Sequence, residues 1–328
     1  MRRYYIEQKL KSAAAFLIIL ILLPYIVSVF VSGTGVRADR KEEETYVQVK
    51  TEDARGEIQT EELGWTEYLV GILAEDLPRD TEHEAVKAQA VLVRTSLYQT
   101  LSKEDKTLES DYLTRGEMQE KWGLSDYQEI YDSYVQAVEE TDNLVLWYGD
   151  GYPWVPFHQS SNGMTRSAEE VTGSKDYPYI AAKECPLDKE AEDEIQVFSF
   201  GYSEIQEKCR DFLVAAEGED EARQGYSFED FEIQSRDSSG YVQKLRIGKT
   251  VCTGDQFRDA LSLPSSDFSF SEDGNKMKIT TSGKGHGLGM SLWTANEMAK
   301  EGKTCEEILN FFFEGTSLKN DVQESDLI

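Results

Sequence analysis

TEHEAVKAQAVLVRTSLYQTLSK, residues 81–103, indicates where the core of this protein lies. Apolar residues occur nearly all round the helix that this stretch predicts, so we expect the helix to lie at the centre of a domain. Thr81 and Glu84 predict a capping box at its N-terminal end. Arg94 lies within the same apolar surface, and a cation in that position needs a carboxylate or a substrate anion as its partner.

Helix and strand patterns alternate on both sides of this central helix. Further helices are predicted at WTEYLVGILAEDL (65–77), which Pro78 ends, at DYQEIYDSYVQAVEET (126–141), at YSEIQEKCRDFLVAAE (202–217) and on either side of Gly302. Strand pairs are predicted at 46–60, at 143–158 with a turn at 149–151, and at 268–281 about Asp273 and Gly274. The alternation predicts an α+β fold with a single mixed helix/strand domain.

The first 43 of the 328 residues precede this domain. Residues 12–36 contain no charged residue and are long enough to cross a bilayer as one helix. Basic residues precede this segment, so the positive-inside rule predicts a cytoplasmic N-terminus at 1–11. We expect a single-pass protein of the cell membrane, with a charged stalk at 37–43, an extracytoplasmic domain at 44–318 and a tail at 319–328. A cleaved signal peptide is the alternative, but its apolar region would be shorter.

The formal net charge of −28 disfavours nucleic acid and anionic surfaces as partners, because the field of the whole protein repels them. Residues 186–235 are especially acidic and polar, and we interpret them as an insertion in the domain. The four cysteines are widely spaced and match no zinc pattern. One or two disulfides and four buried thiols are both consistent with Cys185, Cys209, Cys252 and Cys305.

SGKGHGLGMSLWTANEMAKEG, residues 282–302, places glycines at alternate positions around His286. The spacing matches neither a dinucleotide fingerprint nor a phosphate-binding loop. One interpretation is a flexible turn between a strand and a helix. The other is a groove walled by glycines, in which an extended polymer lies against the main chain and His286 is the functional side chain.

Two further places combine residue types suited to chemistry. Glu75 lies at the predicted C-terminal end of a helix after an apolar run, where the helix dipole and burial both raise a carboxyl pKa, as a general acid requires. FHQSSNGMTRSAEEV, residues 157–171, gathers polar groups that suit a hydroxyl-rich or anionic ligand such as a sugar, namely His158, Ser160, Ser161, Thr165 and Arg166. A solvated glutamate and an ordinary polar loop are the alternatives.

Other hydrolytic chemistry lacks its motifs in this chain. A serine hydrolase of the α/β type would need a Gly-x-Ser-x-Gly elbow, and no such sequence occurs. A zinc protease would need His-Glu-x-x-His, and His83-Glu84 lacks the second histidine. The sequence therefore shows neither a serine-hydrolase nucleophile motif nor a zinc-protease motif to accompany Glu75 and residues 157–171.

Four blocks of the sequence resemble, in order, the stage II sporulation protein D family, which includes amidase-enhancer proteins of the bacterial cell wall. The blocks are WTEYLVGILAEDLPRDTEHEAVKAQAVLVRTSLY, FHQSSNGMTRSAEEV, TGDQFRDALSLPSSDFSF and GKGHGLGMSLWTANEMAKEGKTCEEILNFFFEGT. The resemblance extends over nearly all of residues 64–318. Sporulation members of the family also carry a single N-terminal membrane anchor.

The resemblance implies a lytic transglycosylase that cleaves peptidoglycan glycan strands in a groove of the α+β domain during forespore engulfment. Its expected partners are an amidase that removes stem peptides from the strand and a membrane protein of the engulfment machinery. The family's catalytic acid falls on Glu75, and its other blocks fall on His158, Ser160, Ser161 and His286. One acid/base carboxylate suffices, because the 6-hydroxyl of the substrate is the nucleophile.

Four more residues are expected to contact the strand, namely Thr165, Arg166, Lys284 and Ser291. The two cations among them would face the anionic lactyl groups of muramic acid. Leu292 and Thr294 depart from the family's Ser-Gln-Trp-Gly-Ala, which removes a glutamine contact.

Some relatives bind a metal through cysteines near the histidine, but the cysteines of this chain lie elsewhere, so neither zinc nor another cofactor is expected. The alternative function is a catalytically weak, glycan-binding activator of a cell-wall amidase. A purely structural protein of the envelope is a third interpretation.

Overall fold

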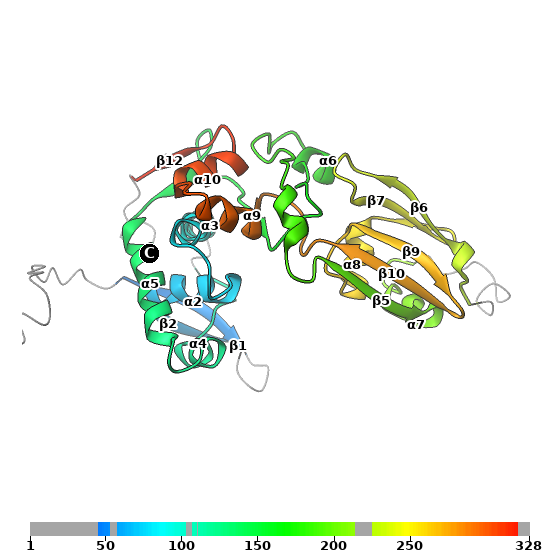
Figure 1. The fold of residues 1–328 in the computed structure, drawn as a ribbon, viewed down its shortest axis with the longest axis horizontal. Helices are drawn as coiled ribbons and strands as arrows, with labels where there is room; N and C mark the ends of the chain where they lie inside the picture. Colours follow the sequence, from blue (N-terminus) through cyan, green and yellow to red (C-terminus); the bar gives the residue numbers. More distant parts are fainter. Residues whose placement is uncertain (1–44, 53–57, 103–106, 110, 214–224, 321–328) are drawn as a thin grey trace, which may run out of the picture. The chain divides into compact units, whose positions relative to one another are not determined.

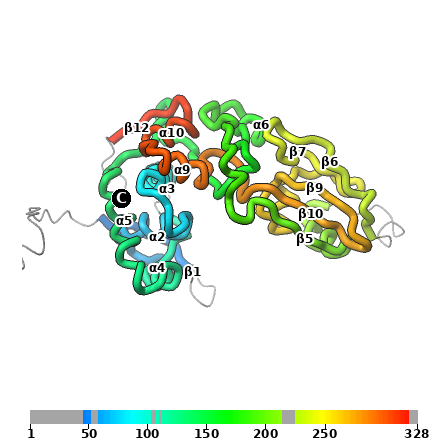
Figure 2. Tube along the Cα trace, in the orientation of Figure 1, coloured from blue at the N-terminus to red at the C-terminus, as the bar shows by residue number. Residues whose placement is uncertain are grey.

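The computed structural model describes residues 45–52, 58–102, 107–109, 111–213 and 225–320. Thr45–Ile328 forms one compact unit of helices and several small sheets, which confirms the α+β prediction (Figures 1 and 2). No helix in the described part of the chain has the length and apolar character that a membrane span requires. The predicted anchor at 12–36, with its flanks at 1–11 and 37–43, lies outside the described residues.

The elements follow one another in mixed order along the chain. The helices are α2 (Trp65–Asp76), α3 (His83–Leu101), α4 (Arg115–Trp122), α5 (Tyr127–Glu140), α6 (Ala168–Thr172), α7 (Tyr202–Lys208), α8 (Gly254–Leu261), α9 (Leu292–Lys300) and α10 (Cys305–Phe312), with 3-10 helices η1 (Pro186–Glu190) and η2 (Phe228–Asp230). The strands are β1 (Tyr46–Glu52), β2 (Ile58–Gly64), β3 (Val145–Trp147), β4 (Phe157–His158), β5 (Ile195–Gly201), β6 (Phe231–Arg236), β7 (Val242–Ile247), β8 (Thr250–Cys252), β9 (Phe268–Asp273), β10 (Lys276–Ser282), β11 (Met290–Ser291) and β12 (Ser317–Lys319).

Helix α3 lies at the centre of one hydrophobic core, as the sequence predicted. It packs against α2, α5, α9, α10 and β3, and Figure 1 shows α9 and α10 beside it. Its buried residues run from Ala85 to Leu101 and cover more than one face. Because the covering segments come from both ends of the domain, α3 brings the first and last blocks of the sequence together.

The start of α3 differs from the prediction. Glu82 is the N-cap residue, and its side chain makes no capping bond. The Thr81 hydroxyl donates to the carbonyl oxygen of Pro78 at 2.7 Å, and the Glu84 carboxylate accepts from the backbone N–H of Cys305 at 2.6 Å. The predicted capping box is therefore wrong, because both of its side chains bond elsewhere, and Glu84 instead ties α3 to the start of α10.

Arg94 is buried on α3 and holds the end of a neighbouring helix. Its Nη1 donates to the carbonyl oxygen of Leu144 at 3.0 Å, and its Nη2 donates to the carbonyl oxygen of Val138 at 3.3 Å and to Thr141 Oγ1 at 3.2 Å. Val138 and Thr141 lie at the C-terminal end of α5, where backbone carbonyls have no partner within the helix, and Leu144 follows shortly after it. The guanidinium thus has a structural role that the sequence did not predict.

A second hydrophobic core is built from two three-stranded antiparallel sheets and the helices α7 and α8. The sheet orders are β5-β10-β9 and β6-β7-β8. The predicted hairpin about Asp273 and Gly274 is confirmed as β9 and β10. Residues 186–235, interpreted as an acidic insertion, supply η1, β5, α7 and most of β6, so this region forms part of the second core.

The predicted hairpin at 143–158 is only partly present. Tyr148 and Gly151 form the expected turn, with backbone hydrogen bonds in both directions. Its two strands, however, do not pair with each other, since β3 pairs antiparallel with β12 and β4 pairs parallel with β11. His158 does lie at the end of β4, as expected, and the parallel pairing places it opposite Ser291.

All four cysteines are buried and free in the structure. Burial raises the pKa of the Cys252 thiol to about 11 and that of Cys185, Cys209 and Cys305 to about 12. The thiolate is the reactive form, so these thiols are inert at neutral pH.

Candidate active site

Helix α2 carries two adjacent carboxylates at its C-terminal end, Glu75 and Asp76. Residues 68–74 of this helix are all buried. Asp76 after them is half-buried, whereas the side chain of Glu75 is exposed to solvent. Pro78 follows closely and prevents the helix from continuing. The two carboxylates are thus neighbours in sequence with different surroundings.

The Asp76 carboxyl group is half-buried between α2 and α3. Gln89, fully buried on α3, donates from Nε2 to Asp76 Oδ2 at 2.9 Å. Burial raises the pKa of the Asp76 carboxyl to about 6, while the hydrogen bond from Gln89 and the charge of Lys121 oppose this rise. A carboxyl group with this pKa can give up and take back a proton near neutral pH, as acid/base catalysis requires.

Lys121 of α4 holds the end of α2 in place. Its Nζ donates to the carbonyl oxygen of Ala74 at 2.5 Å and to that of Glu75 at 3.2 Å. Carbonyls in the last turn of a helix have no helical partner and form the negative end of its dipole. The lysine therefore fixes the backbone that carries both carboxylates and neutralises part of the local negative charge.

Gln159 connects the end of α2 to the segment that follows β4. Its side-chain Nε2 donates to the carbonyl oxygen of Asp76 at 2.9 Å, and its own carbonyl oxygen accepts from the N–H of Trp293 at 3.0 Å. The side chain of Gln159 is exposed. The C-terminal end of α2, the His158 segment and the first turn of α9 therefore meet at this residue.

His158 and His286 lie together, with ring centroids 5.9 Å apart. His158 Nδ1 donates to the carbonyl oxygen of Leu288 at 3.0 Å, so its Nε2 is an acceptor, which is buried and unpartnered among the described residues. His286 Nδ1 accepts from the N–H of Leu288, which leaves the proton on Nε2. Burial lowers the pKa of both imidazoles to about 4, so both are neutral at pH 7. Of the two rings, half-buried His286 is the more accessible to a substrate.

Two buried carboxylates bind the serines of the candidate site. Asp188 of η1 accepts from the N–H and hydroxyl of Ser161 at 2.6 and 2.5 Å and from the Ser291 hydroxyl at 2.8 Å. Glu194 accepts from the Ser160 hydroxyl at 3.2 Å. All three serines, expected to contact substrate, are 2% exposed or less. Their hydroxyls instead fasten the segment after β4 to its neighbours.

Thr165 and Arg166 are likewise engaged inside the protein. Thr165 Oγ1 accepts from the N–H of Lys183 at 2.8 Å. Arg166 is 2% exposed, and its guanidinium donates to Asp237 Oδ2 at 2.7 Å and to Asp255 Oδ1 at 3.0 Å. A buried guanidinium held by two carboxylates is not accessible to an anion from solvent. We therefore assign Arg166 to the scaffold rather than to the lactyl groups of a substrate.

The glycine run around His286 serves contacts within the protein. Its four alternate glycines all have positive φ, namely Gly283, Gly285, Gly287 and Gly289. A Cβ added at Gly285 would lie 2.6 Å from the Cβ of His158, and one added at Gly289 would lie 1.9 Å from the carbonyl oxygen of Pro156. The glycines are thus required for the close approach of this run to β4, which accounts for them without a glycan against the backbone.

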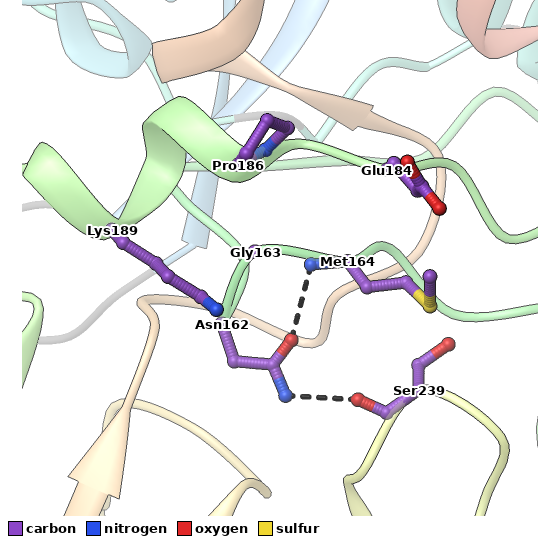
Figure 3. Close-up of a pocket in the computed structure, with 7 residues that line it drawn as sticks. All are labelled: Asn162, Gly163, Met164, Glu184, Pro186, Lys189 and Ser239. Carbon is purple, nitrogen blue, oxygen red and sulfur yellow. Dashed lines mark hydrogen bonds between the residues drawn. The ribbon is translucent and has the colours of Figure 1, made fainter.

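Lys284 is the predicted cation that stays accessible, with a side chain 33% exposed and Nζ 4.0 Å from Asp193 Oδ2. Its backbone forms an antiparallel bridge with Ser160. The segment after β4 also borders a pocket of about 400 Å³, which Asn162 and Lys189 help to line (Figure 3). Accessible positive charge near the site is therefore supplied by lysines.

The residues at this site do not fit the cysteine–histidine metal centre of some relatives. Within the described ranges there is no group of three or more His, Cys, Asp or Glu side chains placed to hold a metal ion. None of the four cysteines of this chain lies in residues 282–302, the stretch around His286.

Sequence reasoning missed several residues on which the site depends, and the signals for them differ. Asp76 is a second carboxylate at the same helix end as Glu75, and Gln89 is a polar residue between apolar ones, so both could have been found. Lys121, Gln159 and Asp188 act through contacts with distant segments. Nothing in the local sequence distinguishes them from ordinary surface residues.

Comparison with known proteins supports the family resemblance of the four sequence blocks described under Sequence analysis. A family model described as "SpoIID: Stage II sporulation protein" matches residues 53–148, which include α2 and α3. Stage II sporulation protein D of Bacillus subtilis (strain 168) is 28% identical over 270 residues, covering 79% of this chain and 75% of the relative. That of Bacillus amyloliquefaciens is 29% identical over 278 residues, covering 81% and 76%.

A third relative comes from a different organism. An uncharacterized protein of Brachyspira hyodysenteriae (strain ATCC 49526 / WA1) is 28% identical over 262 residues, covering 78% of this chain and 67% of the relative. The matches to the two Bacillus proteins cover most of both chains, and the family model matches the part that carries Asp76 and Gln89. This chain is thus similar to stage II sporulation protein D over most of its length.

Proposed function

We propose that this protein is a lytic transglycosylase that cleaves peptidoglycan glycan strands, with its acid/base carboxyl group at the C-terminal end of α2. The observation that carries this proposal is the half-buried Asp76 carboxyl, whose pKa burial raises to about 6. Glu75, to which the family resemblance assigns the acid, lies beside it but is exposed. We therefore favour Asp76 and keep Glu75 as the competing residue.

The carboxyl group takes part in two proton transfers. In its neutral form it donates a proton to the glycosidic oxygen, which leaves with the bonding electron pair. The resulting carboxylate then accepts the proton of the muramic acid 6-hydroxyl while that oxygen bonds to the anomeric carbon of the same sugar. The product is a 1,6-anhydro end, and the enzyme regains its proton. The nucleophile comes from the substrate, so a second carboxylate is not required.

Accessible groups on the glycine run that packs against β4 suit a glycan. The Nε2–H of half-buried His286 can donate to a sugar hydroxyl. Lys284 adds a partly exposed cation to a protein with a formal net charge of −28, where an anionic strand otherwise meets repulsion. The other predicted contact residues are buried and hold the site in place through internal hydrogen bonds, namely His158, Ser160, Ser161, Thr165, Arg166 and Ser291.

The proposed cellular setting follows the sequence and the family. The apolar segment 12–36 would anchor the protein in the cell membrane by a single pass with its N-terminus in the cytoplasm. The domain would then act outside the cytoplasm on strands from which an amidase has removed stem peptides, together with a membrane partner of engulfment. Nucleic acid is not a proposed partner, and no cofactor or zinc ion is proposed.

The test compares the full-length wild type with Glu75→Gln and Asp76→Asn on denuded glycan strands, with anhydro-muramic ends counted by mass spectrometry. Loss of a general acid lowers the rate by about 10²–10⁴-fold, and we expect this for Asp76→Asn. We expect Glu75→Gln to stay within about threefold of wild type, since an exposed carboxylate contributes little to proton transfer. Normal melting temperatures would show that both variants fold.

The opposite pattern would assign the acid to Glu75. If both variants cleaved the strands at the wild-type rate, the acid would lie elsewhere in the protein. Absence of anhydro ends from the wild type, with glycan binding retained, would refute the transglycosylase and favour the glycan-binding activator of an amidase. In that case, stimulation of the amidase should survive in both variants.

A further inference from the structure

Strand β5 is an open edge of the sheet β5-β10-β9 in the second hydrophobic core, and Figure 1 shows β10 between it and β9. Its seven residues pair with β10 over their whole length. Within the described ranges, the backbone of β5 has no strand partner other than β10. The N–H and C=O groups on its other side therefore form a row with which a further strand can pair.

The side chains of β5 are unusual for an exposed edge. Phe198 and Phe200 pack against the second core, whereas Ile195 and Val197 are 69% and 55% exposed. The strand contains no charged residue and no proline, and its register with β10 is continuous, without a bulge. An edge of this kind pairs readily with another chain, so proteins protect their edge strands by charge, by bulges or by short length.

The other edges of the described sheets have such protection. β3, β4, β8, β11 and β12 have only two or three residues each, and β6 has register shifts on either side of Ser235. Charged residues occur in every other edge strand of six or seven residues, namely Lys50 in β1, Glu61 and Glu62 in β2, Glu232 and Arg236 in β6, and Glu272 and Asp273 in β9. This contrast indicates that the open edge of β5 is a contact surface.

The distribution of charge indicates which molecule fits this edge. Copies of a chain with a formal net charge of −28 repel each other, so they meet most favourably where carboxylates are absent or face cations. β5 has no carboxylate, and the exposed residues of the neighbouring β10 include Lys276 and Lys278. Exposed Glu192 and Asp193 precede β5, whereas Lys276 lies opposite Gly201 at its far end. An antiparallel partner strand of the same sequence therefore brings unlike charges near each other at both ends.

We infer that β5 of one molecule pairs antiparallel with β5 of a second copy, which joins two three-stranded sheets into one of six strands. Antiparallel pairing of identical strands is isologous, because the two-fold axis lets each copy supply the same donors and acceptors. Ile195 and Val197 of both copies then lie on one face of the combined sheet, where the partner strand covers part of their apolar surface. The inference concerns assembly and does not depend on the cleavage reaction.

The experiment is sedimentation velocity of the full-length protein in non-ionic detergent over a range of protein concentrations. We expect a monomer–dimer equilibrium in the wild type. Val197→Lys should raise the dissociation constant of the dimer by at least about tenfold, because a two-fold interface contains the new charge twice. Val251→Lys is the matched control and should leave the constant unchanged, since Val251 is also 55% exposed but lies on the three-residue strand β8. Equal melting temperatures of the dilute variants would show that both fold.

Hydrogen exchange of the same proteins tests whether β5 is the interface. The amide groups of β5 that point away from β10 should exchange more slowly as the protein concentration rises through the dissociation constant, and Val197→Lys should abolish this change. A wild type that stays monomeric at every soluble concentration would overturn the inference. A dimer that Val197→Lys leaves intact would also overturn it, since another surface would then hold the copies together. Slow exchange of these amides in the monomer would do the same, because another segment of the same chain would then cover β5.

Discussion

At the scale of residues, Asp76 and Gln89 form the pair that sets the proton affinity of the proposed acid. The Gln89 side chain is fully buried, and its Nε2 donates to the carboxylate, whereas its Oε1 has no partner among the described residues. A donor stabilises the charged form of a carboxyl group and lowers its pKa. Burial acts in the other direction and dominates, which leaves the pKa of Asp76 at about 6.

Gln89→Leu tests this balance through the pH dependence of cleavage. If protonated Asp76 is the active form, kcat/KM falls about tenfold per pH unit above about pH 6. Loss of the donor raises the pKa of Asp76 further, so the alkaline limb of the profile should move to higher pH in the variant. The measurement is kcat/KM for denuded strands between pH 4.5 and pH 8.5, the range that brackets the limb.

Gln99→Leu is the control for this profile. Gln99 lies on the same helix and also uses its amide as a donor, but to the backbone of Tyr152 at 3.0 Å. Its replacement should affect stability without moving the limb. A limb that stays in place in Gln89→Leu, or moves equally in both variants, would show that Asp76 is not the titrating group.

At the scale of elements, the glycine run packs closely against β4 because its glycines have no side chains at the contact. Gly289 has φ +71° and faces the carbonyl oxygen of Pro156, so an added Cβ both strains the backbone and collides with it. Gly302 also has a positive φ, +84°, but an added Cβ there meets open space. The two positions therefore separate backbone strain from close packing.

Gly289→Ala should lower the free energy of unfolding by about 3–5 kcal/mol, because overpacking adds to the cost of positive φ. Gly302→Ala should lower it by only about 1 kcal/mol, from the backbone alone. Urea unfolding of the full-length variants measures both values. Equal losses would mean that the run does not depend on close contact with β4.

The elements also show what the sequence could and could not predict. The helix 65–77, the central helix and the hairpin about Asp273 and Gly274 follow from local periodicity and turn residues, and the structure contains all three. The partners of β3 and β4 could not be predicted, since these strands have three and two residues and pair with segments more than 130 residues away. Strands of this length carry too little pattern to specify a partner.

At the scale of the whole molecule, the site depends on contacts that cross the sequence. Gln159 reaches back to Asp76, and Asp188 joins Ser161 to Ser291. The residue types were visible in the sequence, but their division into scaffold and accessible groups was not. The structure shows this division through burial. The predicted serines are buried, whereas Lys284 and His286 remain accessible.

The free energy of unfolding should change with pH as Asp76 titrates. Asp76 has a folded-state pKa of about 6, above its ordinary value of 3.8, so the folded state holds its proton more tightly than the unfolded state. Its contribution to stability is therefore complete below about pH 4 and is lost as the pH rises through 6. His158 and His286 act in the opposite direction, because their lowered pKa values cost stability as the pH falls from 6.5 toward 4.

These opposing contributions make the wild-type curve alone uninformative, whereas a difference between two variants isolates one group. Asparagine resembles the protonated carboxyl group but does not titrate, so Asp76→Asn removes only the contribution of Asp76. Its free energy of unfolding relative to wild type should increase between pH 4 and pH 7, by up to about 3 kcal/mol. Urea unfolding at four pH values in this interval measures the difference. A difference that does not change with pH would mean that the carboxyl group titrates in the folded protein as it does in the unfolded chain, and the argument for Asp76 as the acid would fail with it.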